Sequence, residues 1–288
     1  MDVTLLVNTS AGDGDHTRAG LRRELEAAGH RVRPARRKGK GLRRALREPG
    51  DLVVAAGGDG TVGRAMKALA GRDVPLAILP LGTANNIATS LGVQGGVADL
   101  ASRWPTARRV RVAIGLVRGP WGETRFVESV GLGLLARMMS PSVDRGIRDV
   151  EDARARLEHL VRTLPLTRWR VEVDGEDLTG DYLLVEALNM SCAGPSLCVT
   201  RQGEPGDATL EVILAGEGER EALRALTRPA ELGAVLLPRA GRRLRLWCRR
   251  KEMHVDHTYG KDLRAPKGLM RVDVELSELG VDVLVPVG

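Results

Sequence analysis

A cluster of glycines directly after a buried apolar segment most constrains what this chain can fold into. Residues 52–56 are all apolar, and Gly57, Gly58 and Gly60 then surround Asp59. Five consecutive apolar residues predict a parallel strand that is covered on both faces. Apolar residues at positions 62, 65, 66 and 69 follow at the spacing of one buried helix face. The sequence therefore predicts a strand, a glycine turn and a helix.

The chemistry of such a turn suits an anion. Glycines tolerate positive φ and let backbone N–H groups approach a ligand closely, and a helix N-terminus adds partial positive charge. A nucleotide phosphate is the expected ligand, with contacts predicted from Gly57, Gly58, Asp59, Gly60, Thr61, Val62 and Gly63. The residues alone leave one alternative open, in which Asp59 and Thr61 cap the helix.

A second unit of the same shape follows. Residues 77–81 predict another buried strand, Gly82 another turn, and Asn85–Ala88 another helix start. Open α/β sheets bind ligands at the carboxyl ends of neighbouring strands. Two such turns, about 22 residues apart, can therefore face one crevice.

The two motifs together resemble the diacylglycerol kinase catalytic family, which includes bacterial lipid kinases, sphingosine kinases and ceramide kinases. They read Gly-Gly-Asp-Gly-Thr over residues 57–61 and Leu-Pro-Leu-Gly-Thr-Ala-Asn-Asn over residues 79–86. The first motif is shared with NAD kinases and phosphofructokinase-like folds, so the order and spacing of the pair carry the resemblance.

The resemblance implies a two-domain fold and a reaction. An α/β nucleotide-binding domain, Rossmann-like and phosphofructokinase-like, would span residues 1–107. A β-rich antiparallel sandwich that binds the lipid acceptor would span residues 108–288, with the extreme C-terminus returning to the first domain. The implied reaction is ATP- and Mg²⁺-dependent phosphorylation of a lipid hydroxyl, on diacylglycerol or a sphingoid base.

The resemblance also implies roles for nucleotide-site residues. Thr83 and Asn85, beside Gly82, would contact phosphate and ribose. Asp59 would approach Mg²⁺ and phosphate, directly or through water, because Mg²⁺ takes few carboxylates and keeps several waters. Asn8 belongs to a loop that preserves part of the family's nucleotide loop, although an ordinary turn in which Asn8 bonds its own backbone is equally open.

The acceptor half departs from the family pattern. Thr258 occupies the position of the family's glutamate base, after Asp256 and His257, and threonine is a poor base at neutral pH. Asp256 or His257 could replace it, although alternation along a strand would point successive side chains to opposite faces. Glu128 replaces an asparagine, and Leu135 replaces an aspartate near the lipid headgroup. The family's metal segment would be Asp207 with the carbonyls of Glu204 and Thr209.

These departures keep two alternatives open. One is a non-catalytic pseudokinase that binds nucleotide, which the threonine at position 258 motivates. The other is a soluble-metabolite kinase of the NAD-kinase type, disfavoured because residues 81–85 match the lipid branch.

Beyond residue 109 the pattern changes to short period-2 segments, which predict an antiparallel sandwich. Trp104–Thr106 reads as the linker, and two helical inserts are expected near residues 143–163 and 217–226. A literal Asp-Gly-Glu at residues 174–176 is predicted to be a hairpin turn. The alternating segments are residues 110–114, 169–173, 182–188, 210–214, 244–246 and 272–276.

The charge and composition of the chain indicate which kinds of binding partner are expected. The net charge is +7, with basic clusters over residues 31–47 and 239–251, but aromatic residues make up only 2% of the chain, which argues against nucleic acid. An anionic membrane surface is the preferred partner, bound peripherally. No apolar run reaches 18 residues, and the cysteines lack C-x-x-C spacing, so unpaired thiols and a cytoplasmic location are expected. Whether the chain forms a homodimer stays open.

Overall fold

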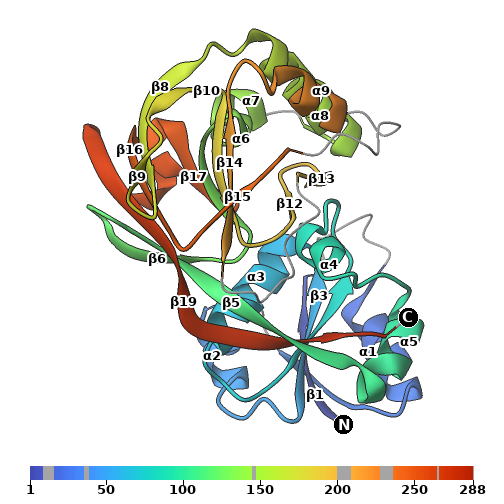
Figure 1. The fold of residues 1–288 in the computed structure, drawn as a ribbon. Helices are drawn as coiled ribbons and strands as arrows, with labels where there is room; N and C mark the ends of the chain where they lie inside the picture. Colours follow the sequence, from blue (N-terminus) through green and yellow to red (C-terminus); the bar gives the residue numbers. More distant parts are fainter. Residues whose placement is uncertain are drawn as a thin grey trace. The chain divides into compact units, whose positions relative to one another are not determined.

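The computed structural model describes residues 1–8, 16–35, 39–144, 147–199, 209–227, 236–264 and 266–287. The chain divides into two compact units (Figure 1). Unit 1 comprises Met1–Ile114 with Glu278–Gly288, and unit 2 comprises Gly115–Ser277. Two long strands, β5 (Arg108–Gly119) and β19 (Leu269–Val285), continue from one unit into the other.

Unit 1 is built on a parallel sheet in the order β19-β4-β3-β1-β2. Its other strands are β1 (Asp2–Val7), β2 (Arg31–Ala35), β3 (Leu52–Gly57) and β4 (Leu76–Pro80). Its helices are α1 (Arg18–Ala27), α2 (Gly39–Ala45), α3 (Asp59–Leu69), α4 (Asn86–Ser90) and α5 (Val97–Arg103), followed by the 3₁₀ turn η1 (Trp104–Thr106). Helices α1 and α5 pack side by side (Figure 1).

The apolar patterns produce these elements as predicted. Every residue of Leu52–Ala56 is fully buried, as expected for a central parallel strand. Val62, Ala65, Met66 and Leu69 form the buried face of α3. Trp104 is also buried and packs against the ring of His30, with 5.2 Å between ring centroids, so η1 is part of the core of unit 1.

Unit 2 is antiparallel. One sheet runs β15-β14-β11-β7-β17-β18, and the other runs β10-β8-β16-β19, with β5 paired to β19 and β6, and β9 paired to β8. The strands are β6 (Gly122–Phe126), β7 (Ser129–Gly133), β8 (Thr167–Val173), β9 (Glu176–Asp177), β10 (Gly180–Tyr182), β11 (Leu184–Leu188), β12 (Cys192–Ala193), β13 (Leu197–Cys198), β14 (Leu210–Ala215), β15 (Arg239–Gly241), β16 (Arg243–Arg249), β17 (Met253–Val255) and β18 (Thr258–Tyr259).

Two apolar clusters hold unit 2 together. The first lies between the two sheets and takes alternate residues from each, among them Val130, Val171 and Val272, which is the arrangement of a sandwich. The second packs helices against the sheet that contains β11. Its helices include α6 (Leu134–Met138), α8 (Val150–Thr163) and α9 (Arg220–Leu226), and α7 (Pro141–Asp144) lies next to α6.

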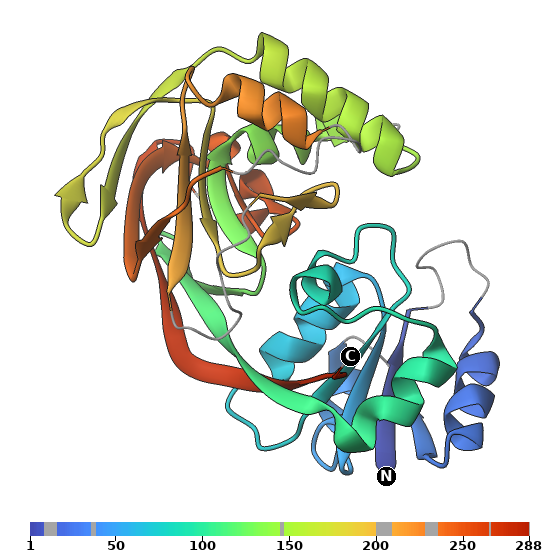
Figure 2. The ribbon, with the colours of Figure 1, turned by 45° about the vertical axis from the view of Figure 1, so that its right-hand side comes forward.

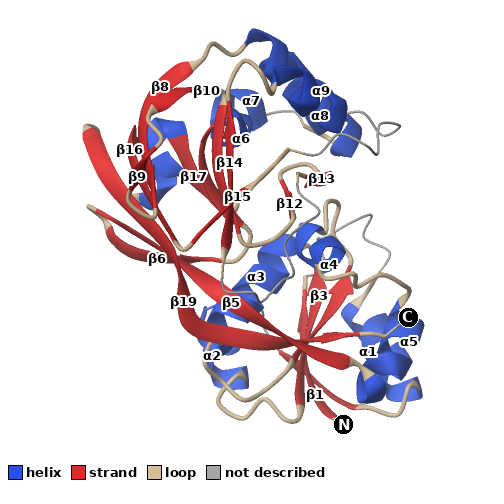
Figure 3. Cartoon of the chain, in the orientation of Figure 1, coloured by secondary structure: helices blue, strands red, loops and turns tan. Residues whose placement is uncertain are grey.

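Unit 2 contains both helices and strands, as Figures 2 and 3 show. Helices α8 and α9 lie side by side (Figure 2), and strands make up most of the rest of the unit (Figure 3). The predicted combination of an α/β domain and an antiparallel β-sandwich is confirmed. None of the helices in the described ranges is long and apolar enough to cross a membrane.

Two local predictions have clear outcomes. Asp174 and Gly175 form the predicted hairpin turn between β8 and β9, with φ of 51° and 92°. The expectation of unpaired thiols is wrong for Cys192 and Cys198, which form a disulfide, while Cys248 is free and buried. The antiparallel pairing of β12 with β13 places the two cysteines opposite each other, a register that residue spacing does not reveal. The cysteine argument for a reducing compartment is thereby lost.

Candidate active site

The glycine turns of unit 1 lie at the carboxyl edge of its sheet, together with the end of β1. Strands β1, β3 and β4 are neighbours in parallel register, so Asn8, Gly57 and Leu81 follow them at the same edge. The amide of Asn8 donates to the Ala56 carbonyl at 2.9 Å, and the amide of Leu81 donates to the Gly57 carbonyl at 3.3 Å. The two predicted turns and Asn8 are therefore brought together.

Gly58 and Gly82 are in direct backbone contact. A Cβ placed on Gly82 would lie 2.3 Å from the Cα of Gly58, and one placed on Gly58 would lie 3.1 Å from the Cα of Gly82. Neither backbone can move aside as a flexible side chain could. Glycine is required at position 82 because the second turn packs directly on the first.

Asp59 links the two turns through a hydrogen bond. Its carboxylate is 6% exposed, and Oδ1 accepts from the amide of Ile87 at 2.9 Å. The alternative that Asp59 caps its own helix is not seen, because the N-cap of α3 is Gly58 without a side-chain bond. Asp59 instead caps the first turn of α4. Its Oδ2 accepts no hydrogen bond from the part of the chain that the structure describes.

Asn85 shapes the second turn. It adopts a φ of 51°, its Oδ1 accepts from the Gly82 amide at 2.9 Å, and its Nδ2 donates to the Gly82 carbonyl at 2.7 Å. A further bond reaches the Pro80 carbonyl at 3.3 Å. The side chain thus spans the turn, and its predicted contact with a nucleotide stays a prediction. Thr83, in the same turn, is exposed.

The start of α3 offers unused donors. The amides of Asp59 and Gly60 donate to no group within the described ranges, as expected for the first turn of a helix. The hydroxyl of Thr61 is buried there and also lacks a hydrogen-bond partner among the described residues. Val62 and Gly63, predicted to contact nucleotide, are buried in the next part of the helix. This end of α3 can accept an anion through backbone N–H groups.

In unit 2, the segment that matches the family's catalytic segment forms a tight hairpin. Strands β17 and β18 pair through Val255 and Thr258, so Asp256 and His257 occupy the turn. Thr258 is exposed, whereas Asp256 is 8% exposed and has a φ of 47°. The carboxylate of Asp256 accepts from the amides of Val127 and Glu128 at 3.0 and 2.8 Å. Asp256 is thus engaged in fixing the backbone.

The other side chain of the turn meets a buried glutamate. His257 Nε2 lies 2.8 Å from Glu128 Oε1. The side chain of Glu128 is 4% exposed, and that of His257 is 47% exposed. The sequence did not predict this pair, because its members are far apart in the chain.

A second acid–histidine pair is buried in the sheet of unit 2. Gly131 on β7 is opposite both Glu186 on β11 and His254 on β17. A Cβ on Gly131 would lie 1.9 Å from Glu186 Oε2, so the missing side chain lets the carboxylate reach His254 Nε2, 3.0 Å away. Burial alone would lower the pKa of His254, but the Glu186 carboxylate and its hydrogen bond raise that pKa overall. His254 Nδ1 bonds the Asp256 carbonyl at 2.9 Å, so both ring nitrogens have protein partners.

Glu186 also borders an apolar pocket. The pocket is lined almost wholly by leucines and valine from α6, α8, α9 and the segment around β13. The space inside it is enough for one water molecule at most. Leu135 is one of its walls, at the position where the family resemblance expects an aspartate, so this part of the unit is less polar than the resemblance implies.

Of the predicted metal segment, only Thr209 is described, and it directly precedes β14. Asp207 and Glu204 lie outside the described residues.

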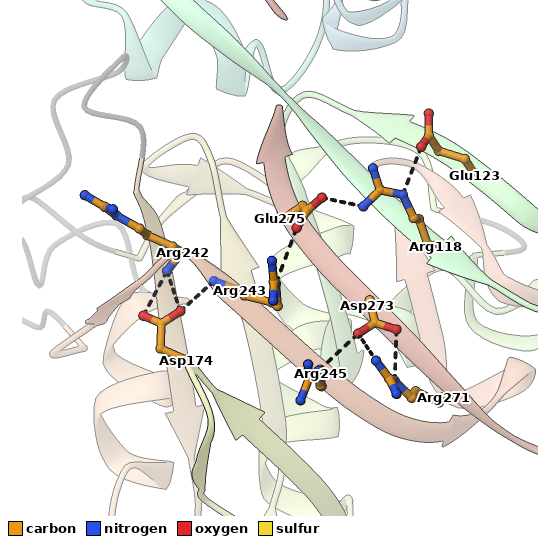
Figure 4. A network of polar contacts seen from close by, with 9 residues as sticks. All are labelled: Arg118, Glu123, Asp174, Arg242, Arg243, Arg245, Arg271, Asp273 and Glu275. Carbon is orange, nitrogen blue, oxygen red and sulfur yellow. Dashed lines mark hydrogen bonds and ion pairs between the residues drawn. The ribbon is translucent and has the colours of Figure 1, made fainter. Parts of the chain in front are cut away.

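The second basic cluster, residues 239–251, is largely ion-paired. Figure 4 shows Arg242 and Arg243 donating backbone amides to Asp174, and Arg243 and Arg118 both reaching Glu275. Arg245 lies 3.2 Å from Asp273, and Arg239 pairs with Glu176. In the first cluster, Arg31 and Arg33 face Asp2. By contrast, the basic residues on and after α2 are exposed without an ion pair among the described residues: Lys40, Arg43, Arg44 and Arg47.

Comparisons with known proteins indicate the same family that the two glycine motifs resemble. Residues 2–117 match the family model for the diacylglycerol kinase catalytic domain. A diacylglycerol kinase of Mycobacterium tuberculosis is 30% identical over 193 residues, which cover 61% of this chain and 58% of that protein. The chain thus spans less than three fifths of that relative. A Cronobacter sakazakii protein named a probable YegS-like lipid kinase is 29% identical over 240 residues, 79% of each chain.

Solved structures support the fold. A Bacillus anthracis structure titled as a diacylglycerol kinase superposes with a TM-score of 0.69 at 17% identity, covering 99% of this chain and 96% of that one. Yeast NADH kinase superposes less closely, with a TM-score of 0.55 at 13% identity, covering 99% of this chain and 83% of that one. The family resemblance drawn from the two glycine motifs is confirmed. Over residues 2–117, the chain is similar to the diacylglycerol kinase catalytic domain family.

Proposed function

We propose that the chain is a lipid kinase that uses ATP and Mg²⁺ to phosphorylate the hydroxyl of a lipid such as diacylglycerol or a sphingoid base. The observation that carries this proposal is the contact between Gly58 and Gly82, which joins the two glycine turns into one anion-binding edge. The family of residues 2–117 and the names of the relatives support the same reaction class.

The residues at this edge fit a nucleotide triphosphate. The unused amides of Asp59 and Gly60 and the unpartnered hydroxyl of Thr61 are donors for phosphate oxygens. Asp59 Oδ2 can hold Mg²⁺ through a bound water, while Oδ1 keeps α4 in place. Mg²⁺ would supply charge neutralisation on the phosphoryl group during transfer. In such transfers, positioning and electrostatics supply most of the rate enhancement.

The acceptor would be held by unit 2. The pocket bordered by Leu135, Leu157 and Leu223 offers an apolar surface for an acyl or sphingoid chain. Because its present volume is close to that of one water molecule, a lipid tail must push α8 and α9 away from the sheet to enter. The acceptor hydroxyl would remain outside this apolar lining.

The substrate's location implies an encounter with a membrane surface. The exposed basic residues of α2 are the candidates for that contact, because most of the second cluster is matched by carboxylates. Exposed lysine and arginine each contribute about 1 kcal/mol to binding of an anionic membrane.

The direct test is incubation with γ-labelled ATP, Mg²⁺ and a panel that contains diacylglycerol, sphingosine, ceramide and NAD⁺, followed by separation of the products. Label in a lipid supports the proposal. Label in NAD⁺ alone would replace it with the soluble-metabolite alternative. Nucleotide binding without label in any acceptor would identify a pseudokinase. Asp59→Asn is the control, because it removes the charge of the nucleotide site while keeping an oxygen for the Ile87 amide.

A further inference from the structure

The disulfide of unit 2 joins a buried cysteine to an exposed one. Cys192, on β12, is 2% exposed, whereas Cys198, on β13, is an exposed residue. Thiol–disulfide exchange begins when a thiolate attacks one of the two sulfurs, so its rate depends on access to that sulfur. Exposed disulfides are accordingly the labile ones in proteins. The accessible point of attack in the folded chain is therefore Cys198 Sγ.

The two cysteines lie on a very short hairpin. Strands β12 and β13 contribute two residues each, with Cys192 opposite Cys198. One position further along, the amide of Val199 donates to the Ser191 carbonyl at 3.0 Å. An isolated two-stranded hairpin is marginally stable in water even when it is longer than this. The disulfide adds a covalent link that prevents the two strands from separating.

This hairpin forms one wall of the apolar pocket in unit 2. Leu197 and Val199, on either side of Cys198, are buried and line the pocket. Other wall residues come from α6, α8, α9 and β11. A Cβ placed on Gly194, in the hairpin turn, would lie 3.1 Å from Leu135 Cδ2, so the turn also packs against α6. Because the space inside is enough for one water molecule at most, the pocket is closed while the hairpin stays in place.

The third cysteine is not suited to exchange with this disulfide. Cys248 is fully buried on β16, in the apolar cluster between the two sheets. Burial raises the pKa of its thiol to about 12. Since the thiolate is the form that attacks a disulfide, Cys248 remains an unreactive thiol at neutral pH. It provides an internal control for reactions at the other two cysteines.

We propose that the bond between Cys192 and Cys198 is a thiol–disulfide exchange site, and that its reduction by a dithiol opens the apolar pocket of unit 2. A thiolate of the dithiol bonds to Cys198 Sγ, the bond between the two cysteine sulfurs breaks, and Cys192 leaves as a thiolate. The second sulfur of the dithiol then bonds to the first, and Cys198 leaves as a thiolate. Two electrons and two protons thus pass from the dithiol, which becomes a disulfide, to the cysteines, which become thiols.

Reduction changes the wall of the pocket rather than the core of the sandwich. Without the covalent link, β13 can separate from β12 by a local opening and carry Leu197 and Val199 out of the wall. Neither residue belongs to the apolar cluster between the two sheets. In the proposed lipid kinase this pocket would take the acyl or sphingoid chain, so the redox state would control acceptor binding; this consequence rests on the proposed function.

The test compares the oxidised wild type with the same protein reduced by dithiothreitol, and it uses cis-parinaric acid, a fluorescent long-chain fatty acid, as the probe. Reduction should strengthen probe binding by about tenfold or more, because a closed pocket leaves the open form as a minority of about 10% or less. Iodoacetamide should label Cys198 in the folded reduced protein and leave Cys248 unlabelled. Amide hydrogen exchange should accelerate in peptides that cover residues 190–199 and stay unchanged in peptides that cover β16.

Two substitutions separate the disulfide from other effects of dithiothreitol. Cys198→Ser should bind the probe as the reduced wild type does, with or without dithiothreitol. Cys248→Ala is the matched control and should keep the wild-type response to the reductant. Cys192→Ala also removes the bond and replaces Cys198→Ser if that variant does not fold, and the reduced wild type needs no substitution.

Three results overturn the proposal. The first is a disulfide that dithiothreitol does not reduce in the folded protein. The second is equal probe affinity for the oxidised wild type, the reduced wild type and Cys198→Ser. The third is loss of the cooperative thermal transition on reduction, which would make the disulfide a general requirement for folding. Because these measurements contain no ATP, an absence of lipid phosphorylation overturns the proposed function without altering them.

Discussion

Substitutions of Asp59 can distinguish its proposed role in nucleotide binding from its structural role as the cap of α4. Its Oδ1 caps α4, and its Oδ2 accepts no hydrogen bond from the described residues. Asp59→Asn keeps an oxygen for the Ile87 amide, so thermal stability should stay close to that of the wild type while Mg²⁺-dependent nucleotide turnover is lost. Asp59→Ala should lose turnover and, in addition, about 1 kcal/mol of stability for the missing cap. Calorimetric melting and an ATP turnover assay distinguish the two effects. Normal turnover in folded Asp59→Asn would show that Asp59 serves only as a cap.

At the residue scale, the sequence identifies candidate site residues, but it does not show which residues they contact. The glycine motif identified Asp59, but its partner Ile87 directly follows the second motif, 28 residues away. The sequence marks Glu128 as a departure from the family pattern and His257 as one candidate for the missing base, but it does not place the two together. Their pairing depends on how β17 lies against β7, and the periodicity of a strand does not specify its neighbour.

At the scale of single elements, the contact of the two glycine turns gives a paired prediction. Gly82→Ala should destabilise unit 1 by about 1–3 kcal/mol, because the new methyl group would collide with the backbone of Gly58. Gly60→Ala is the matched control: the nearest atoms to its Cβ are the guanidinium nitrogens of Arg64 at 3.9 Å, so its melting temperature should be unchanged or higher. Equal melting temperatures for Gly82→Ala and the wild type would contradict the direct packing of the turns.

The buried pair of Glu186 and His254 predicts a pH-dependent stability. The pKa of His254 is raised in the folded chain, so the folded state binds a proton that the unfolded state releases above about pH 6.5. The stabilisation is therefore complete below that pH and is lost as pH rises through the folded pKa. Denaturant midpoints across this window should fall more steeply with pH for the wild type than for His254→Gln. His159→Gln, on the exposed face of α8, should follow the wild type. Parallel curves for all three proteins would refute a charged His254.

The elements themselves were largely predictable, and their pairing was not. Runs of apolar residues and period-2 segments located β3, β14 and β16, because burial on one or both faces of a strand produces a recognisable pattern of apolar residues. The disulfide and the Glu186–His254 pair depend on which strands are neighbours. Two local signals were present but unused: a glutamate inside the apolar run of β11, and Gly131 inside β7. A buried charge needs a partner, and a strand glycine marks a close approach.

At the scale of the whole molecule, we expect membrane binding to depend less on the net positive charge than on the position of the exposed basic residues that have no ion pair. Arg43→Gln with Arg47→Gln removes two exposed charges from the α2 region, and Arg18→Gln with Arg23→Gln removes the same total charge from α1. The first pair should weaken binding to phosphatidylglycerol vesicles by about 2 kcal/mol, and the control pair should weaken it much less. Wild-type binding should also fall as salt rises, because the screening length is about 10 Å at 0.1 M. Equal losses in both double variants, or equal binding to neutral vesicles, would remove α2 as the docking surface.

The most direct test of the account is the stoichiometry of phosphoryl transfer: the amount of phosphorylated lipid formed per ADP released from ATP and Mg²⁺ in lipid micelles. We predict one labelled lipid per ADP for the wild type, little ADP when the lipid is omitted, and neither product from Asp59→Asn. ADP release that is the same with and without lipid would indicate hydrolysis by water. Tight ATP binding without ADP or labelled lipid would contradict the claim that the joined glycine turns serve a lipid kinase.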